Sequence, residues 1–218
     1  GRGIQVHEKL IFQFLAGAVA AWWVYTKLDP HWHSLSIPFD GRINAGLWIV
    51  PIIIFFVMFT ANAVNIADGL DGLAGGSLLI TFVGLTIISW IDGRTAFAPL
   101  NATVAGALLA YTYFNIKPAR FQMGDVGSLG LGALLAINMI SIDRTLFIPI
   151  FGFVFYIETF AVILQVLSRR LFGRRLFKMA PLHHHLEFKG WSEEKIVMRF
   201  WILHALMVVV GIWMAIYK

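Results

Sequence analysis

Residues 46–61 form a run of apolar and small side chains that carries no charge, and similar runs recur along the chain. Of the 218 residues, 59% are hydrophobic and 13% are charged, whereas soluble domains average about 45–50% apolar and about 25% charged residues. Apolar runs of this length are typical of helices that cross a bilayer. The composition therefore predicts an integral membrane protein and argues against a soluble globular domain.

Hydropathy predicts seven apolar segments for helices of about 20 residues, the length that crosses a bilayer. The third and fifth segments are short, but the small residues beside them can complete a crossing. We therefore expect an all-α fold, a polytopic transmembrane helix bundle with about seven spans, in one transmembrane domain over residues 1–218. The expected segments are 10–25, 46–61, 77–91, 97–114, 129–142, 146–167 and 196–217.

The connections between these segments fall alternately on two sides of the membrane, and the two sides differ in positive charge. Twelve of the 17 Lys and Arg residues belong to the side that holds the N-terminus and the connections 62–76, 115–128 and 168–195. Because cytoplasmic loops are enriched in Lys and Arg, this side is expected to face the cytoplasm. The opposite side is interpreted as structural, and its loop 26–45 is expected to be irregular, with Trp32 as an aromatic anchor at the membrane interface. The chain has no cysteine, which excludes disulfide bonds and thiolate chemistry.

Four polar side chains spaced three apart follow the uncharged run: Asn62, Asn65, Asp68 and Asp71. At helical geometry a step of three residues turns the chain by about 300°, so neighbouring members are close enough to share a ligand. Carboxylates this close repel each other, and a cation would offset the repulsion. Capping of the next helix is the alternative, but polar groups at a membrane edge are costly and favour a functional role.

A second polar segment, residues 114–129, contains Asn115 and a glycine-flanked Asp125. Asp125 is expected near the start of a helix, where the macrodipole favours anions and backbone N–H groups can hold a phosphate. It is interpreted as an N-cap or as a ligand of Mg²⁺, which commonly binds one or two carboxylates together with phosphate oxygens and water. With Asp68 and Asp71 it places three acidic groups on one membrane face, a pattern that suits metal-assisted phosphoryl transfer.

A third segment, residues 179–191, contains three consecutive histidines, His183, His184 and His185. Consecutive side chains point in different directions on any regular backbone, so we do not expect them to chelate one metal ion together. Imidazoles beside a phosphate can donate hydrogen bonds or transfer protons near neutral pH. The preceding arginines, within residues 169–175, are interpreted as topology determinants or contacts to anionic lipids.

These three segments resemble, in order and in separation, the signature regions of the phospho-N-acetylmuramoyl-pentapeptide transferase family. The matching stretches are 62–75 (NAVNIADGLDGLAG), 114–132 (FNIKPARFQMGDVGSLGLG) and 180–201 (APLHHHLEFKGWSEEKIVMRFW). The resemblance implies a Mg²⁺-dependent transferase of the polyprenyl-phosphate N-acetylhexosamine-1-phosphate transferase superfamily. Such an enzyme joins the phospho-sugar of UDP-N-acetylmuramoyl-pentapeptide to undecaprenyl phosphate, which gives lipid I and UMP for peptidoglycan synthesis. The implied location is the bacterial inner membrane, with the active-site cleft facing the cytoplasm.

The resemblance also implies a role for each residue that matches a motif. Asp125 would be the Mg²⁺ ligand, and Asp68 and Asp71 would organise the metal and nucleotide region. The expected catalytic residues are Asp68, Asp71, Asp125 and His183. The expected substrate-binding residues are Lys9, Asn62, Asn65, Asn115, His184 and His185. Besides the two substrates, membrane lipid is an expected partner, a homodimer is a candidate assembly, and nucleic acid is not expected.

Two features of the chain depart from the family pattern. Family members begin with three more spans that end in a paired-aspartate motif, often assigned to the lipid phosphate, and this sequence has no Asp-Asp pair. The chain is therefore expected to correspond to the C-terminal part of the family fold and to be catalytically incomplete without the missing segment. The family usually has Phe where this chain has Gln122, with Phe121 one residue earlier. Stacking on uracil is therefore expected to be weaker or shifted.

Two alternative functions remain open. The first is a related transferase that acts on UDP-N-acetylglucosamine or a similar sugar, although the unbroken histidines followed by Glu187 and Gly190-Trp191 point to the muramoyl branch. The second is a non-catalytic membrane protein, either a transporter-like bundle or an inactive remnant. Transporters commonly show internal hydropathy symmetry, which this sequence lacks.

Overall fold

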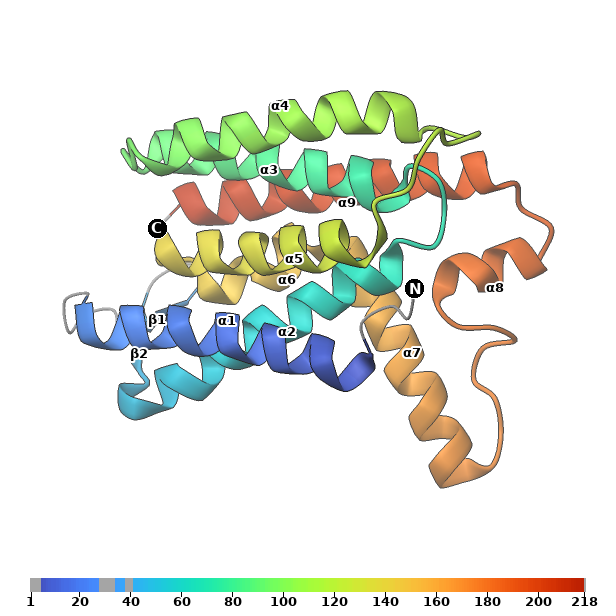
Figure 1. Ribbon diagram of the computed structural model, residues 1–218, viewed down its shortest axis with the longest axis horizontal. Coiled ribbons are helices and arrows are strands. Elements are labelled where there is room, and N and C mark those ends of the chain that lie inside the picture. Colours follow the sequence, from blue (N-terminus) through green and yellow to red (C-terminus); the bar gives the residue numbers. More distant parts are fainter. Residues whose placement is uncertain (1–4, 28–33, 38–40, 218) are drawn as a thin grey trace.

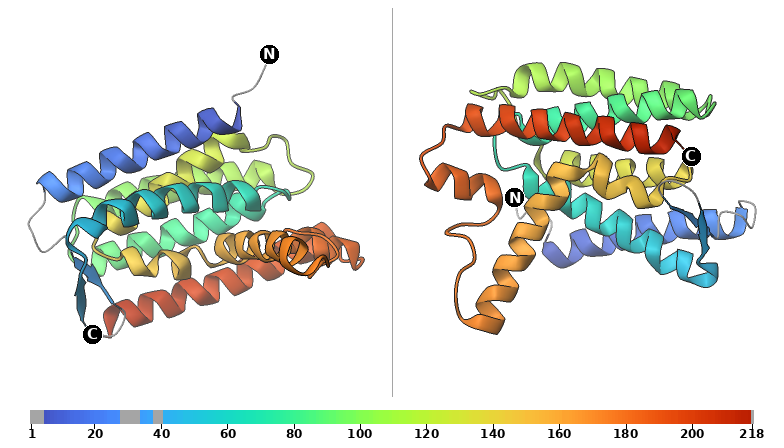
Figure 2. Two further views of the ribbon diagram at one scale, coloured as in Figure 1. Left: turned by 90° about the horizontal axis from the view of Figure 1, so that it is seen from below. Right: turned by 180° about the vertical axis from the view of Figure 1, so that it is seen from behind.

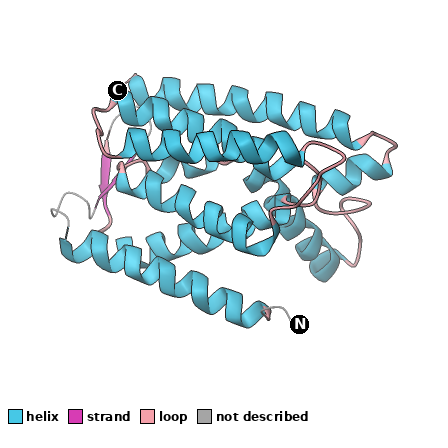
Figure 3. Cartoon of the chain, turned by 45° about the horizontal axis from the view of Figure 1, so that its top comes forward, coloured by secondary structure: helices cyan, strands magenta, loops and turns pink. Residues whose placement is uncertain are grey.

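The computed structural model describes residues 5–27, 34–37 and 41–217, and this part of the chain is almost entirely helical (Figure 3). The all-α fold is therefore confirmed. The one sheet in these ranges is an antiparallel hairpin of β1 (Ser34–Ser36) and β2 (Arg42–Asn44). The helices are α1 (Val6–Lys27), α2 (Ile49–Ala67), α3 (Leu73–Ile91), α4 (Phe97–Asn115), α5 (Gly124–Ser141), α6 (Ile148–Phe151), α7 (Phe153–Phe172), α8 (Leu182–Phe188) and α9 (Glu193–Ile216), with the 3₁₀ helices η2 (Gly46–Trp48) and η3 (Thr145–Phe147).

The long helices lie side by side in a bundle (Figure 1). Helix α2 packs against α1, α5 and α7, and α3 packs against α4 and α9. The core between them holds large side chains that are almost completely buried, including Phe82, Phe147, Phe151 and Phe155. Helix α7 is the exception to this arrangement, because it starts inside the bundle and then diverges from it (Figure 2).

Five helical segments of the described chain are long and apolar enough to cross a membrane, and they contain α1, α2, α3, α5 and α9. The pair formed by residues 145–151 and α7 counts as a sixth span if the two helices, bent by 86°, are taken together. Helix α4 has 19 residues, but its polar side chains lower its hydropathy, and it is outside this set. The chain is thus a multi-pass membrane protein with five or six such spans, where hydropathy predicted about seven.

The break between α6 and α7 leaves backbone groups that cannot bond within a helix, and buried side chains satisfy them. The Thr81 hydroxyl donates a hydrogen bond to the carbonyl oxygen of Phe151 (2.8 Å), and Nδ1 of His204 accepts the N–H of Val154 (3.3 Å). Nε2 of His204 lies 2.8 Å from the Thr81 hydroxyl, so one polar cluster joins both sides of the break. Because an unsatisfied backbone group is costly inside a membrane, this cluster stabilises the bend.

Ion pairs close the end of the bundle that carries the C-terminus and the β-hairpin. The Arg144 guanidinium contacts both oxygens of Asp92 (3.0 and 3.3 Å), and Arg42 contacts Asp143 (2.6 Å). The Ser36 hydroxyl also donates to the carbonyl oxygen of Asp143. These contacts tie the hairpin, the α3–α4 connection and the α5–α6 connection into one layer. Trp32, the interfacial anchor expected in this loop, lies outside the described residues.

Candidate functional site

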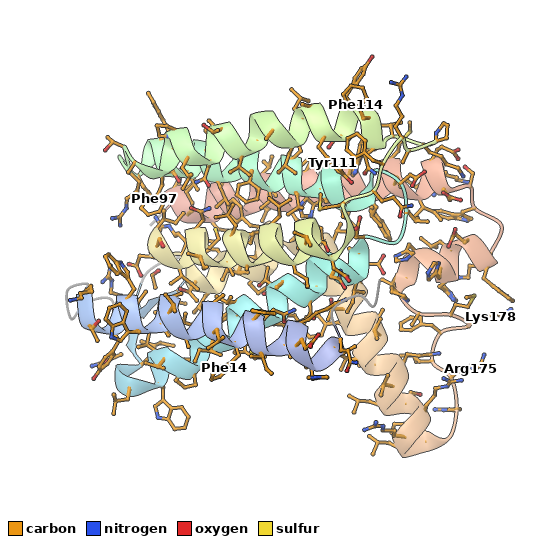
Figure 4. The ribbon with its side chains drawn as sticks, in the orientation of Figure 1. Phe14, Phe97, Tyr111, Phe114, Arg175 and Lys178 are labelled. Atoms are coloured by element: carbon orange, nitrogen blue, oxygen red, sulfur yellow. The ribbon has the colours of Figure 1, made fainter. Side chains whose placement is uncertain are left out.

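The polar motifs meet at the opposite end of the bundle, the end that Tyr111 and Phe114 mark in Figure 4. Helix α2 runs beyond its expected end at residue 61 to Ala67, so Asn62 and Asn65 are helical. Asp68 follows the helix directly, and Asp71 lies in the short turn before α3 rather than on a continuous helix. The end of α4 and the start of α5 reach the same end of the molecule.

Asp125 is the centre of the site. It lies in the first turn of α5, and because Met123 occupies the N-cap position, the N-cap interpretation of Asp125 is wrong. One carboxylate oxygen pairs with the Lys9 ammonium, and the other accepts a hydrogen bond from the Asn65 amide (2.8 Å). The same amide donates to the hydroxyl of Ser128 (2.8 Å). The Asp125 side chain is 48% exposed, so a ligand can reach the carboxylate.

Asp68 lies close enough to Asp125 for the two charges to interact. Burial raises the pKa of Asp68 above its ordinary value of 3.8, a hydrogen bond from the backbone N–H of Gly124 opposes this, and the charge of Asp125 raises the pKa further. Two neighbouring carboxylates, one half-exposed and one partly buried, offer the hard oxygen ligands that Mg²⁺ prefers. The residues therefore fit a Mg²⁺ ion whose other ligands come from phosphate and water.

Asp71 and Asn115 hold the loops of the site together. The Asp71 carboxylate accepts the backbone N–H of Ala119 (3.0 Å). Asn115 is 3% exposed; its oxygen accepts the N–H of Gly72 (3.0 Å) and its amide donates to the carbonyl of Phe121 (3.0 Å). Gly72 has a φ of 83°, a conformation that glycine adopts without strain. These two polar side chains thus shape the site through the backbone of the loops.

Asn62 faces α1 instead of the acidic residues. Its amide donates to the side-chain oxygen of Gln13 (2.6 Å) and to the carbonyl oxygen of Met58 (2.8 Å). Gln13 also lines a groove of about 460 Å³ between α1 and α5, with walls that are mostly apolar. Lys9 and Asp125 lie in the same groove. An amphiphilic ligand fits such a shape, because its apolar part can occupy the groove while its charged group reaches Lys9.

His183 is buried between α7 and the turn that carries Asp68 and Asp71. The fully buried Glu158 accepts the backbone N–H groups of Leu182 (2.6 Å) and His183 (3.1 Å). A Glu158 oxygen also lies 3.3 Å from Nδ1 of His183, a close contact that lacks hydrogen-bond geometry. On its other side the imidazole approaches Gly69 so closely that a Cβ there would lie 2.6 Å from Nε2. Glu158 thus fixes this histidine against the acidic turn.

The three histidines differ in their other contacts, but the rings of His183 and His184 lie against each other with centroids 4.3 Å apart, so the prediction that consecutive histidines point in different directions does not hold for this pair. Nδ1 of His184 lies 2.6 Å from a Glu187 oxygen, and the His185 ring packs against Phe177 with ring centres 5.8 Å apart. Across the part of the chain that the structure describes, no three His, Asp or Glu side chains are grouped to hold a metal ion. The expected metal site therefore depends on ligands beyond these side chains.

Sequence reasoning missed several residues of this region: Gln13, Tyr111, Ser128 and Glu158. Glu158 had a visible signal, because it is the one acidic residue in the apolar segment 146–167 and such residues are usually functional. Tyr111 had none. Its hydroxyl is buried near the backbone of Met123 and the charges of Asp68 and Asp71, and its ring packs on Phe121 with centroids 5.4 Å apart.

Curated proteins that are similar to this chain carry the name of the family whose motifs the sequence resembles. A phospho-N-acetylmuramoyl-pentapeptide-transferase of Clostridium perfringens (strain 13 / Type A) is 42% identical over 202 residues, which are 92% of this chain and 63% of that protein. The transferases of the same name from Chlorobium chlorochromatii (strain CaD3) and Levilactobacillus brevis (strain ATCC 367) are 39% and 38% identical over 92% and 99% of this chain, which covers 61% and 66% of their lengths. The chain thus spans less than two thirds of the length of these curated relatives.

A family profile matches most of the chain. The profile described as Glycosyl transferase family 4 matches residues 2–143, which is more than half of the chain and includes the first two polar motifs. Lys9 and Asn65 both contact Asp125 in the site, and all three lie within the matched residues. The protein therefore belongs to glycosyl transferase family 4.

Proposed function

We propose that this chain carries the phosphoryl-transfer site of a phospho-N-acetylmuramoyl-pentapeptide transferase. The proposed reaction transfers the phospho-sugar of UDP-N-acetylmuramoyl-pentapeptide to undecaprenyl phosphate at the inner face of the bacterial cytoplasmic membrane, giving lipid I and UMP. The observation that carries the proposal is the convergence of Asp68, Asp125, Lys9 and Asn65 at one end of the bundle, within the residues that the family profile matches.

The site suits a substrate rich in negative charge. A diphosphate and an incoming phosphate repel each other, so groups that offset their charge lower the barrier to exchange of the phosphoanhydride. Lys9 supplies a cation and Asn65 supplies amide hydrogens. Asp125, with Asp68 beside it, would hold Mg²⁺, which stabilises charge on phosphate oxygens when bound.

The histidines occupy the other wall of the proposed cleft. Glu158 holds the buried His183 so that Nε2 lies against the turn between Asp68 and Asp71, and we assign this imidazole to positioning the two carboxylates of that turn. We assign His184 and His185 to the donor substrate, because both lie on α8 next to this ring. Asn62 and Asn115 then act by shaping the groove and the loops.

The proposal is tested in two steps with the purified chain in detergent. Calorimetry measures binding of UDP-N-acetylmuramoyl-pentapeptide and of UDP-N-acetylglucosamine, each with and without Mg²⁺. Release of UMP is then measured after addition of undecaprenyl phosphate, with the part of a relative that this chain does not cover supplied in trans. We expect Mg²⁺-dependent binding of the muramoyl donor, and UMP release that falls about 100-fold or more in Asp125→Asn.

Glu8→Gln is the matched control, because Glu8 is an exposed carboxylate one residue from Lys9. Binding and UMP release should be unchanged in this variant. Preference for UDP-N-acetylglucosamine would assign the chain to the related transferases. Absence of any Mg²⁺-dependent binding of either nucleotide sugar would refute the proposed site.

A further inference from the structure

The end of α7 and the segment after it form a basic hairpin, residues 164–178, whose charges have no acidic partner among the residues that the structure describes. No Asp or Glu occurs between Glu158 and Glu187. All five cations are exposed, and within the described ranges none of them lies within ion-pair distance of a carboxylate. The cations are Arg169, Arg170, Arg174, Arg175 and Lys178.

Hydrogen bonds from two side chains of α7 fix the shape of the basic hairpin. The oxygen of Gln165 accepts the backbone N–H groups of Leu176 (3.1 Å) and Phe177 (2.8 Å), and its amide donates to the carbonyl of Phe177 (2.8 Å). The Ser168 hydroxyl donates to the carbonyl of Arg174 (2.9 Å). All of these bonds end on backbone atoms. The hairpin is therefore ordered without any contribution from its guanidinium groups.

The basic hairpin encloses a hollow that is lined by both apolar and cationic side chains. A cavity of about 600 Å³ is lined by Leu167, Leu171 and Phe172 together with Arg174 and Arg175. A second cavity of about 330 Å³, next to the first, is also lined by Arg175 and by Lys178. In Figure 4, Arg175 and Lys178 lie at the same end of the molecule as the candidate site and away from Phe97.

The position of α7 puts this hollow at a membrane surface. Helix α7 turns by 86° from the preceding helix and leaves the bundle, and its apolar side chains remain exposed: Ile163 37%, Leu164 47%, Val166 43%, Leu167 45% and Leu171 70%. Apolar side chains with this exposure, beside helices that cross the bilayer, contact lipid acyl chains. The cations at the end of the same helix then lie at the level of the lipid headgroups.

We propose that the basic hairpin binds the headgroup of an anionic phospholipid such as phosphatidylglycerol. Arg174 and Arg175 pair with the lipid phosphate, for which the planar guanidinium is well suited, and Leu167 and Leu171 contact the first part of the acyl chains. A soluble anion would contact only the cationic side chains and leave the apolar lining of the hollow unused. The combination of cations and lipid-exposed leucines therefore favours a lipid as the occupant.

The absence of cysteine in the chain allows a direct measurement. Met179, which is 45% exposed and next to Lys178, is replaced by Cys and labelled with bimane. The protein is reconstituted into vesicles of phosphatidylcholine and phosphatidylglycerol, and quenching is compared between nitroxide-labelled forms of the two lipids. We expect preferential quenching by phosphatidylglycerol, and a preference that falls about fivefold for each arginine replaced in Arg174→Gln and Arg174→Gln/Arg175→Gln.

The matched control removes two positive charges at the other end of the bundle, in Lys27→Gln/Arg94→Gln, and should keep the full preference. The preference should also fall as salt is added, since these charges are exposed. Equal quenching by the two lipids in the wild type, or an unchanged preference in the double arginine variant, would overturn the proposal.

Two further arms distinguish other occupants of the hollow. Loss of the phosphatidylglycerol preference on adding inorganic phosphate would assign the hollow to a soluble anion. Displacement by a small fraction of undecaprenyl phosphate would assign it to the lipid acceptor. Either result would overturn the phospholipid assignment. No nucleotide sugar is present, so the outcome is independent of the proposed transferase activity.

Discussion

Replacement of Glu158 by Gln tests how α8 and its histidines are held. The two oxygens of this buried carboxylate accept the first N–H groups of α8, those of Leu182 and His183. Gln retains one oxygen and replaces the other with an NH₂ group, which cannot accept a hydrogen bond. One backbone N–H at the start of α8 is then left without a partner in a buried position.

The magnitude follows from the cost of that unsatisfied group. A buried donor without a partner costs about 1–3 kcal/mol, which corresponds to about 5-fold to about 150-fold in the equilibrium for local opening of α8. Most of the bundle contacts lie elsewhere, so this opening should be local. The global thermal midpoint should change much less than the exchange rates of α8.

Hydrogen–deuterium exchange with mass spectrometry measures this opening in detergent. We expect residues 181–190 to exchange faster by the stated factor in Glu158→Gln, while α3 and α9 exchange at the wild-type rate. Glu187→Gln is the control, because Glu187 contacts the His184 side chain and leaves the N–H groups of Leu182 and His183 paired. Wild-type exchange of residues 181–190 in Glu158→Gln would refute the assigned role of this carboxylate.

Three further predictions concern the turn and the opposite end of the bundle. Gly69→Ala places a methyl group 2.6 Å from Nε2 of His183, so we expect the thermal midpoint to fall with a loss of about 1–3 kcal/mol. Burial raises the pKa of Asp68, so ionisation of this carboxyl reduces the stability of the fold as pH rises from the ordinary value of 3.8 through the raised pKa. In Mg²⁺-free buffer, the thermal stability of Asp68→Asn relative to wild type should therefore increase as pH rises from about 4 to about 8. Asp92→Ala leaves the Arg144 side chain, 8% exposed, without its carboxylate, and we expect a loss of about 3 kcal/mol in thermal or denaturant unfolding.

Each of these predictions has a clear contrary result. Gly106→Ala is the control for the first, because no heavy atom lies within 4 Å of the added Cβ, and equal stability of the two alanine variants would show that His183 does not press on the turn. For Asp68→Asn, a stability gain confined to acidic pH would have the wrong sign. For Asp92→Ala, unchanged unfolding would show that the Asp92–Arg144 pair contributes no stability.

The apolar segments were predictable because hydropathy is a local property of the sequence. Their ends were not. Helix α2 continues past residue 61 because the amides of Asn62 and Asn65 find partners on α1 and α5, contacts that hydropathy does not contain. Helix α3 begins at Leu73, four residues before its expected start, because Ala and Gly there have low hydropathy and yet continue the helix, as expected for small flanking residues.

The collection of the three polar motifs at one end followed from the alternation of spans, and the structure agrees with it. The pairings within that end needed the tertiary structure. Lys9 and Asp125 are 116 residues apart, and nothing local marks Glu158 as the partner of α8. The segment 146–167 was predicted as one span, because Thr81 and His204, the residues that stabilise its break, lie far away in the sequence.

Because of the bend before α7, this helix can rotate as a rigid rod about the point where Thr81 and His204 hold its N-terminal end. The 20 residues of α7 give an arm of about 30 Å, and Glu158 lies about 8 Å from the pivot. A rotation of about 3° would therefore move the far tip by about 1.5 Å and Glu158 by only about 0.4 Å. Glu158 therefore stays nearly fixed under the histidines when α7 tilts. Any tilt that the surrounding bilayer imposes on this helix mainly displaces its C-terminal end, which carries the arginines.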